Sequence, residues 1–163
     1  MRIRDSRPDD WPAVWAFAKP VIESGEHFVW EPGTPEDLLR EHWIGEREAP
    51  SSSFVAEVDG RVCGVAEIHP NQKGRGSHIA NAGFMVDPEA RGKGIGRALG
   101  EAAIARAKAD GFTAMQFNAV VATNTAAVAL WHSLGFRTLA LLPATFRHPT
   151  EGLVDMHLMF REL

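Results

Sequence analysis

The chain has 163 residues, of which 45% are hydrophobic, and this length suits one compact domain with a single buried core. A net charge of −4 argues against broad affinity for nucleic acid, and a single cysteine excludes an internal disulfide. No long apolar run indicates a membrane segment and the N-terminus lacks a signal peptide's apolar stretch, so we expect one cytoplasmic domain over residues 1–163, without nucleic-acid or membrane partners.

The first half of the chain predicts a short strand, two helices and a hairpin. Apolar residues recur at helical spacing in two segments, and strand-like alternation follows them. Asp59-Gly60 is a strong signal for a two-residue hairpin turn. The expected strands are 3–5, 53–58 and 61–69, and the expected helices are 9–24 and 34–47.

The second half alternates strands and helices and then ends in two strands. The expected strands are 77–86, 114–121, 137–142 and 154–160, and the expected helices are 94–110 and 124–134. Residues 143–152 are expected to form a connecting loop, which could cover a small cavity with Phe146, Arg147 and His148. The order of elements predicts a mixed α/β fold.

The run Arg91-Gly92-Lys93-Gly94-Ile95-Gly96-Arg97 joins a predicted strand to a predicted helix. Its glycines let the backbone turn tightly and present N–H groups, and the helix N-terminus and basic side chains add positive charge. A dinucleotide fingerprint would need glycine at Arg97, and a Walker loop would need Ser or Thr at Gly94. We therefore expect a polyphosphate of another kind, although a glycine-rich loop also caps helices for structural reasons.

The remaining pattern, Arg-x-x-Gly-x-Gly, resembles the pyrophosphate loop of the GNAT superfamily of acyl-CoA-dependent N-acetyltransferases. Residues 124–136 resemble its other signature, Asn-x-x-Ala followed by a Leu-aromatic pair and Gly-Phe. Asn124 is also a good helix N-cap and Gly135 a helix stop, so an ordinary capped core helix explains that segment without a ligand. A predicted strand separates the two matches, which makes a chance resemblance to this superfamily improbable.

The resemblance implies a sheet of about seven strands with four helices, in which strands four and five are parallel and splay apart to admit the pantetheine arm of acetyl-CoA, the cosubstrate. It implies direct attack of an amine on the thioester, with a backbone N–H near the end of strand four supporting the oxyanion. The matching coenzyme-binding residues are Phe84, Met85, Val86, Arg91, Gly92, Lys93, Gly94, Ile95, Gly96, Arg97, Asn124, Ala127 and Trp131.

One departure from the family concerns the leaving thiolate, which a tyrosine of the second signature usually protonates. This chain contains no tyrosine, and Trp131 occupies the matching position. An indole N–H donates a hydrogen bond but is no acid near neutral pH. Either water protonates the thiolate or the thiolate leaves unassisted. A thiol with a pKa of about 8–9 is an acceptable leaving group without a general acid.

Motifs between Pro70 and Leu163 narrow the resemblance to the proline-analogue N-acetyltransferases, which act on azetidine-2-carboxylate and related cyclic secondary amines. The matching residues are Asn81-Ala82-Gly83-Phe84, Phe117-Asn118, Thr123-Asn124, Leu130-Trp131, Leu134-Gly135-Phe136 and Val154-Asp155. By this resemblance Asn81 hydrogen-bonds the attacking nitrogen, while Asn118 and Ala119 offer backbone N–H groups to the acceptor carboxylate. Asn124 supports the coenzyme.

The base that deprotonates the acceptor stays open, because asparagine has no titratable group and the proton would otherwise go to water. His78 is the alternative base, since it lies on the same predicted strand and histidine titrates near neutral pH. Strict alternation places His78 and Asn81 on opposite faces, so both reach one site only if a bulge near Ala82-Gly83 shifts the strand. A structural histidine at the strand end is the competing interpretation.

Residues 23–31 are the expected wall of the acceptor site, with His27 and Phe28 as candidate acceptor-binding residues, although they also suit loop anchors. The histidines lack ligand spacing such as His-x-x-x-His, so no metal site is expected. Three functions remain open: a small-molecule N-acetyltransferase, a protein or peptide N-acetyltransferase, and a non-catalytic acyl-CoA-binding module. The sequence allows a homodimer through edge strands near the C-terminus but does not require one.

Overall fold

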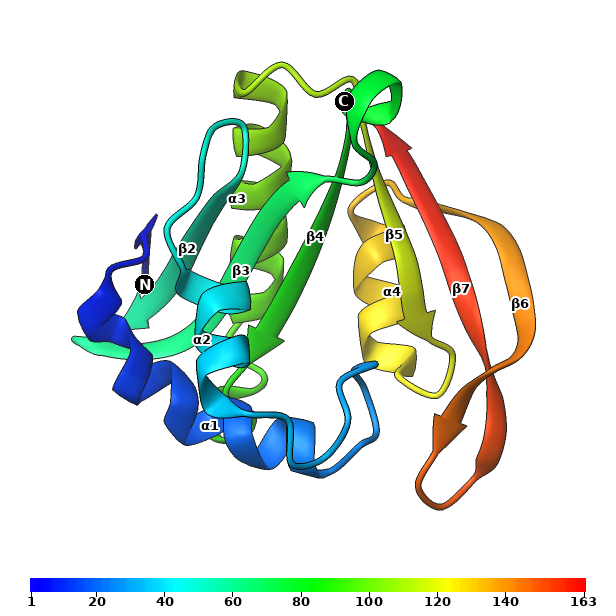
Figure 1. Ribbon diagram of the computed structural model, residues 1–163, viewed down its shortest axis with the longest axis horizontal. Coiled ribbons are helices and arrows are strands. Elements are labelled where there is room, and N and C mark those ends of the chain that lie inside the picture. The colour runs from blue at the N-terminus through cyan, green and yellow to red at the C-terminus, as the bar shows by residue number, and fades with distance from the viewer.

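The computed structural model describes residues 1–163 and shows one mixed sheet with helices on both faces (Figure 1). The strands lie in the order β1-β2-β3-β4-β5-β7-β6, and only β4 and β5 run parallel. The strands are β1 (Arg2–Asp5), β2 (Ser52–Val58), β3 (Arg61–Pro70), β4 (Ile79–Val86), β5 (Ala114–Val121), β6 (Arg137–His148) and β7 (Gly152–Glu162). The α-helices are α1 (Trp11–Glu23), α2 (Glu36–Ile44), α3 (Ile95–Ala109) and α4 (Thr125–Ser133). The predicted fold class is confirmed.

Two hydrophobic clusters fix the helices on the sheet. α1 and α2 pack on one face, where Leu39 and Trp43 of α2 and Val65 of β3 are buried. α3 and α4 pack on the other face around Leu99 and Met115 (Figure 1). None of the helices has the length and apolar character that crossing a bilayer requires.

The strands β4 and β5 pair only where they begin. Ile79 lies opposite Ala114 and Ala80 opposite Met115, and the two strands then diverge (Figure 1). β4 nevertheless stays paired with β3 along residues 80–86. The expected splay between strands four and five is therefore confirmed, and it opens a gap within the sheet.

The prediction that residues 143–152 form a connecting loop is wrong. β6 and β7 run through this segment as one long hairpin, with a turn at residues 149–151. The pairing is irregular between Leu142 and Phe146, next to Pro143, which cannot donate a ladder hydrogen bond. Phe146 and His148 are buried within the hairpin, so they do not form a lid.

The register of the β3–β4 ladder is continuous, so β4 has no bulge near Ala82-Gly83 that would bring His78 and Asn81 to one site. β4 begins at Ile79, so His78 lies before the strand and the alternation argument does not apply to it. The His78 side chain is exposed, and its Nδ1 lies 3.1 Å from the carbonyl oxygen of Arg75. This position is at the closed end of the β4–β5 pair.

Replacing Asp10 by Asn should destabilise the fold. Arg4 donates to both Asp10 oxygens at 2.8 Å, which holds the pKa of the Asp10 carboxyl below its usual 3.8 although burial raises it. Hydrogen bonds to charged groups contribute about 1.5–3 kcal/mol, so urea denaturation at pH 7 should show a loss of that order. Because the folded-state pKa is depressed, this contribution is present above pH 3.8 and lost below it. A difference between the two proteins that stays constant down to pH 2 would contradict this account.

Candidate functional site

The glycine-rich run forms the turn between β4 and α3. Gly92 and Gly94 have positive φ angles of 77° and 76°, a left-handed conformation in which other residues are strained. Gly94 is the N-cap of α3, which begins at Ile95. The first N–H groups of a helix have no partner within it, so this turn presents unpaired donors where the sequence predicts a phosphate.

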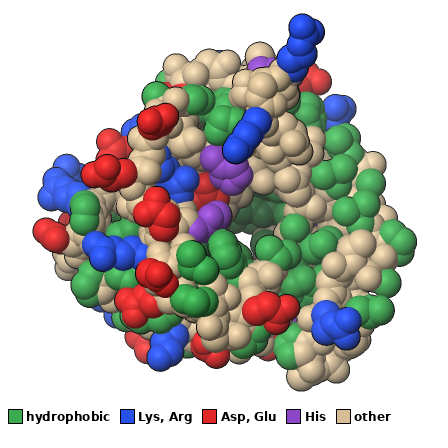
Figure 2. All heavy atoms as spheres, in the orientation of Figure 1, with side chains coloured by type: hydrophobic (Ala, Val, Ile, Leu, Met, Phe, Trp, Pro, Cys, Tyr) green, Lys and Arg blue, Asp and Glu red, His purple; other side chains and the backbone are tan.

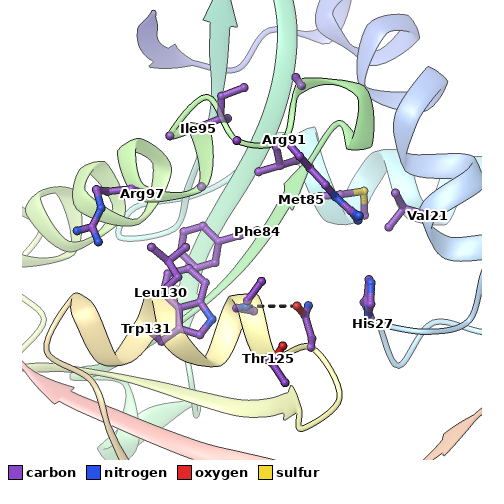
Figure 3. Close-up of a pocket in the computed structure, with 18 of the residues that line it drawn as sticks. Val21, His27, Phe84, Met85, Arg91, Ile95, Arg97, Thr125, Leu130 and Trp131 are labelled. Carbon is purple, nitrogen blue, oxygen red and sulfur yellow. Dashed lines mark hydrogen bonds between the residues drawn. The ribbon is translucent and has the colours of Figure 1, made fainter. Parts of the chain in front are cut away.

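A cavity of about 610 Å³ opens beside this turn (Figure 3). Every predicted coenzyme-binding residue except Lys93 lines it. Figure 3 shows the Arg91 side chain reaching along the cavity, whereas Arg97 points toward α4. Arg97 donates to the Ser133 hydroxyl at 2.7 Å and lies 3.6 Å from Glu101, so Arg91 is the more available cation.

The helix α4 forms the other side of this cavity. The Asn124 side chain accepts a hydrogen bond from the Ala127 N–H at 3.2 Å, which confirms the predicted N-cap (dashed line in Figure 3). Trp131 is buried, and its ring centroid lies 4.6 Å from that of Phe84 and 4.8 Å from that of Phe117. These rings line the gap between β4 and β5.

The backbone of β4 presents donors to the gap. The carbonyl of Ile79 and the N–H of Asp87 bond toward β3. Because backbone groups alternate in direction along a strand, the even-numbered residues point their N–H groups toward β5. The Ala82 N–H donates a hydrogen bond to the Asn81 side-chain oxygen at 2.8 Å. The next such N–H, that of Phe84, lies where β5 has diverged.

A second cavity of about 370 Å³ adjoins the first, since Phe84 and Trp131 line both. It lies between β4, β5 and the segment that joins α1 to α2. It brings together the predicted residues Asn81, His27, Phe28, Asn118 and Ala119. Its lining contains no Lys, Arg, Asp or Glu, so it offers amide, imidazole and apolar groups to a ligand.

The strand β5 is irregular at this cavity. Its register with β7 shifts between Phe117 and Val120, so the exposed backbone of residues 118–119 lies outside the regular ladder. The Asn118 side chain donates to the Asn71 side-chain oxygen at 2.7 Å and accepts from the Gln116 amide at 2.9 Å. These bonds occupy the Asn118 side chain, and both Asn118 and Ala119 line the cavity.

His78 lines neither cavity, so the structure does not bring it together with Asn81. Sequence analysis did not single out Glu67, a carboxylate of β3 that is buried behind Gly83 of the second cavity. The available signal was a charged residue inside the apolar run 65–68.

The sequence profile described as the Acetyltransferase (GNAT) family matches residues 4–136, which is most of the chain. The protein belongs to the GNAT family. GNAT enzymes use acetyl-CoA as the acetyl donor, and the glycine turn and the splayed strands of this chain lie where the family resemblance places the coenzyme.

Several GNAT proteins are similar to this chain. The structure of a GCN5-related N-acetyltransferase from Kribbella flavida is 44% identical, covers 99% of this chain and 97% of that one, and has a TM-score of 0.95. A phosphinothricin acetyltransferase from Sinorhizobium meliloti in complex with acetyl-CoA is 26% identical, covers 99% and 88%, and has a TM-score of 0.85. N-acetyltransferase aca1 of Schizosaccharomyces pombe is 42% identical over 107 residues, 64% of this chain and 51% of that protein. Among three curated relatives, the chain spans about half the length of two and 15% of the third.

Proposed function

We propose that this GNAT protein transfers the acetyl group of acetyl-CoA to the nitrogen of a small amine. The observation that carries the proposal is the pair of adjoining cavities. One ends at the glycine turn and suits a diphosphate, and the other ends at Asn81 and suits a small amine. They meet beside Phe84 and Trp131, so a thioester held in the first would present its carbonyl to the second.

The residues of the first cavity fit acetyl-CoA. Unpaired N–H groups at the start of α3 and the Arg91 guanidinium match the charge of a diphosphate. The Phe84 N–H matches an oxygen of the pantetheine arm or of the thioester carbonyl. Acetyl-CoA supplies an activated acyl group, and the chain supplies orientation and a donor for the developing oxyanion.

We further propose a cyclic secondary amino acid, of the azetidine-2-carboxylate kind, as the acceptor. A cavity of about 370 Å³ admits a molecule of this size. The Asn81 side-chain oxygen has a second lone pair that can accept a hydrogen bond from an N–H of the acceptor, and the exposed residues 118–119 offer backbone N–H groups to a carboxylate in a cavity that offers no cation. The whole-chain similarity to a phosphinothricin acetyltransferase agrees with a small acceptor.

The test is the release of free coenzyme from acetyl-CoA across a panel of amines: cyclic secondary amino acids, primary amines, polyamines, phosphinothricin-like compounds and short peptides. We expect turnover with the cyclic secondary amino acids. Turnover confined to peptides would replace the small acceptor by a protein acceptor. Tight coenzyme binding without turnover on any amine would instead favour a non-catalytic acyl-CoA-binding module, which the absence of tyrosine in this chain makes the competing function.

Replacing Trp131 by Phe should leave catalysis largely intact. An indole is no acid near neutral pH, so its loss should reduce turnover by less than the roughly 100-fold that removing a general acid costs. The melting temperature should fall, because the buried ring packs on Phe84 and Phe117. Steady-state kinetics and thermal melting check both effects. A loss of turnover beyond that limit, with coenzyme affinity retained, would assign Trp131 a part in the chemistry.

A further inference from the structure

A cluster of ionisable side chains lies behind the second cavity, which we call the acceptor cavity. The cluster is on the face of the sheet that α2 covers. At its centre Glu67 of β3 is 1% exposed. Its Oε2 lies 2.7 Å from His69 Nδ1 and 3.8 Å from Arg47 Nη1, and its Oε1 lies 3.7 Å from His42 Nε2. A buried ion pair is weak evidence for stability, and this one lies directly behind Gly83 of the second cavity.

The histidine of this cluster lies next to the acceptor cavity. His69 is the partner of Asn81 in the β3–β4 ladder, and the side chains of such partners project from the same face about 4.5–5.5 Å apart. Asn81 and Gly83 line the cavity, and a Cβ built on Gly83 would lie 2.8 Å from Glu67 Oε1. Figure 2 shows histidine side chains along one side of a hollow in the middle of this face.

The contact with Glu67 leaves His69 one nitrogen for a ligand. A ring whose Nδ1–H donates to a carboxylate keeps its lone pair on Nε2. Of the groups around this pair, His42 and Arg47 also ionise, whereas Asn81 does not. Burial lowers the pKa of His42 below its usual 6.5, although Glu67 raises it, so the neutral form of His42 is favoured.

We propose that His69, oriented by Glu67, is the base that takes the proton from the acceptor amine. This inference builds on the proposed acetyl transfer. The ammonium gives one proton to His69 Nε2, and the freed lone pair forms the N–C bond with the thioester carbonyl carbon. The C–S bond breaks, the coenzyme leaves as a thiolate, and the second proton on nitrogen goes to water. His69 is then a catalytic residue and Glu67 a positioning residue.

Two other histidines could serve as the base, and each can be tested. His27 lines both cavities, but its acidic neighbour is the half-exposed Glu26, 3.8 Å away in a loop. His69 and His78 both lie outside the two cavities, but His69 is the ladder partner of the cavity residue Asn81, whereas His78 precedes β4 and contacts the Arg75 carbonyl. A buried carboxylate at hydrogen-bonding distance distinguishes His69 from both.

The first experiment needs no substrate. Nitrogen NMR of ¹⁵N-histidine-labelled protein, with the His69 signals assigned by their loss in His69→Gln, reports which ring nitrogen carries the hydrogen. We expect Nδ1–H and an unprotonated Nε2 at neutral pH. A neutral ring with its hydrogen on Nε2 would overturn the assignment, and this result would stand even if the protein acetylated no amine.

The second experiment compares kcat/KM and coenzyme affinity among three variants: His69→Gln, Glu67→Gln and, as a control, His157→Gln. His157 is bonded to Thr138 on the α4 side of the sheet, away from the cluster. We expect His69→Gln to lower kcat/KM by about 100-fold or more with an unchanged coenzyme Kd. The ratio of wild type to His69→Gln should shrink as the pH falls, because protonated His69 accepts no proton; taking a ratio cancels the ionisation of the amine itself.

Glu67→Gln should lower kcat/KM less than His69→Gln does. It should also keep the acid limb of the wild-type pH profile, which is the fall in kcat/KM at low pH, because His69 remains present but less well oriented. His157→Gln should behave as wild type. Unchanged kcat/KM in His69→Gln, or a loss of the acid limb in His27→Gln or His78→Gln instead, would overturn the proposal. Absence of turnover in the wild type with every amine would refute the proposed function, and the NMR result would then decide on the His69–Glu67 pair.

Discussion

Gly94→Glu is expected to abolish coenzyme binding. Gly94 is the N-cap of α3 with a φ of 76° and nothing within 4 Å of a built Cβ, so a side chain there projects into the space proposed for the diphosphate. A unit charge about 5 Å from a phosphate costs about 3 kcal/mol at an effective dielectric constant of about 20, which is roughly 100-fold in Kd. Isothermal titration with coenzyme A measures the effect.

Two controls separate charge from backbone strain. Gly94→Gln carries the same bulk and the same left-handed strain without the charge, so it should bind coenzyme more tightly than Gly94→Glu. Gly60→Glu places a carboxylate at a φ of 80° in the β2–β3 turn, with nothing near its Cβ, and should bind as wild type does. An unchanged Kd in Gly94→Glu would refute the assignment of the glycine turn to the coenzyme.

Asn81→Ala is expected to lower kcat while leaving the coenzyme Kd nearly unchanged. Asn81 lines the acceptor cavity and bonds the Ala82 N–H at the point where β4 leaves β5. Loss of a buried hydrogen-bonding partner costs about 1–3 kcal/mol, which corresponds to roughly 5–150-fold in rate. Steady-state kinetics with the best amine of the panel, together with coenzyme titration, measures both quantities.

Asn81→Asp is the matched variant. It keeps oxygens that can accept from the Ala82 N–H and from an amine N–H, and it removes only the amide N–H₂ group. Recovery in Asn81→Asp would assign the effect to the side-chain oxygen, whereas a loss in both variants would assign it to the N–H₂ group. Turnover that Asn81→Ala leaves intact would make the residue structural and remove the main support for a proline-analogue acceptor.

The parts of this site that follow from local chemistry could be predicted from sequence. Asn124 caps α4, Gly135 ends it with a φ of 85°, and the glycine run turns into α3 as expected, because each depends on a few consecutive residues. The splay of β4 and β5 was anticipated from the family resemblance and not from the residues themselves.

The parts that depend on distant contacts were missed. Pro143 was interpreted as the end of a strand, yet the partner strand β7 keeps β6 extended beyond it. The Glu67 cluster forms because the register of β3 and the position of α2 bring Arg47 and His42 to one carboxylate. No local sequence pattern predicts these contacts between distant residues. His78 was an alternative candidate because of its place in the predicted strand, but the pairing of β4 with β3 sets which residues face the cavity.

The divergence of β4 from β5 leaves two strand edges unpaired in the interior of a sheet. Exposed edges of this kind normally invite pairing with another chain, but here α4 and the segment between α1 and α2 shelter them. A ligand whose own amides bond to the β4 edge would take the place of a missing strand, as in strand addition. It would also join the half-sheet β1–β4 to the half-sheet β5–β7–β6, which share only two ladder pairs, so a bound ligand would add to the backbone contacts between them.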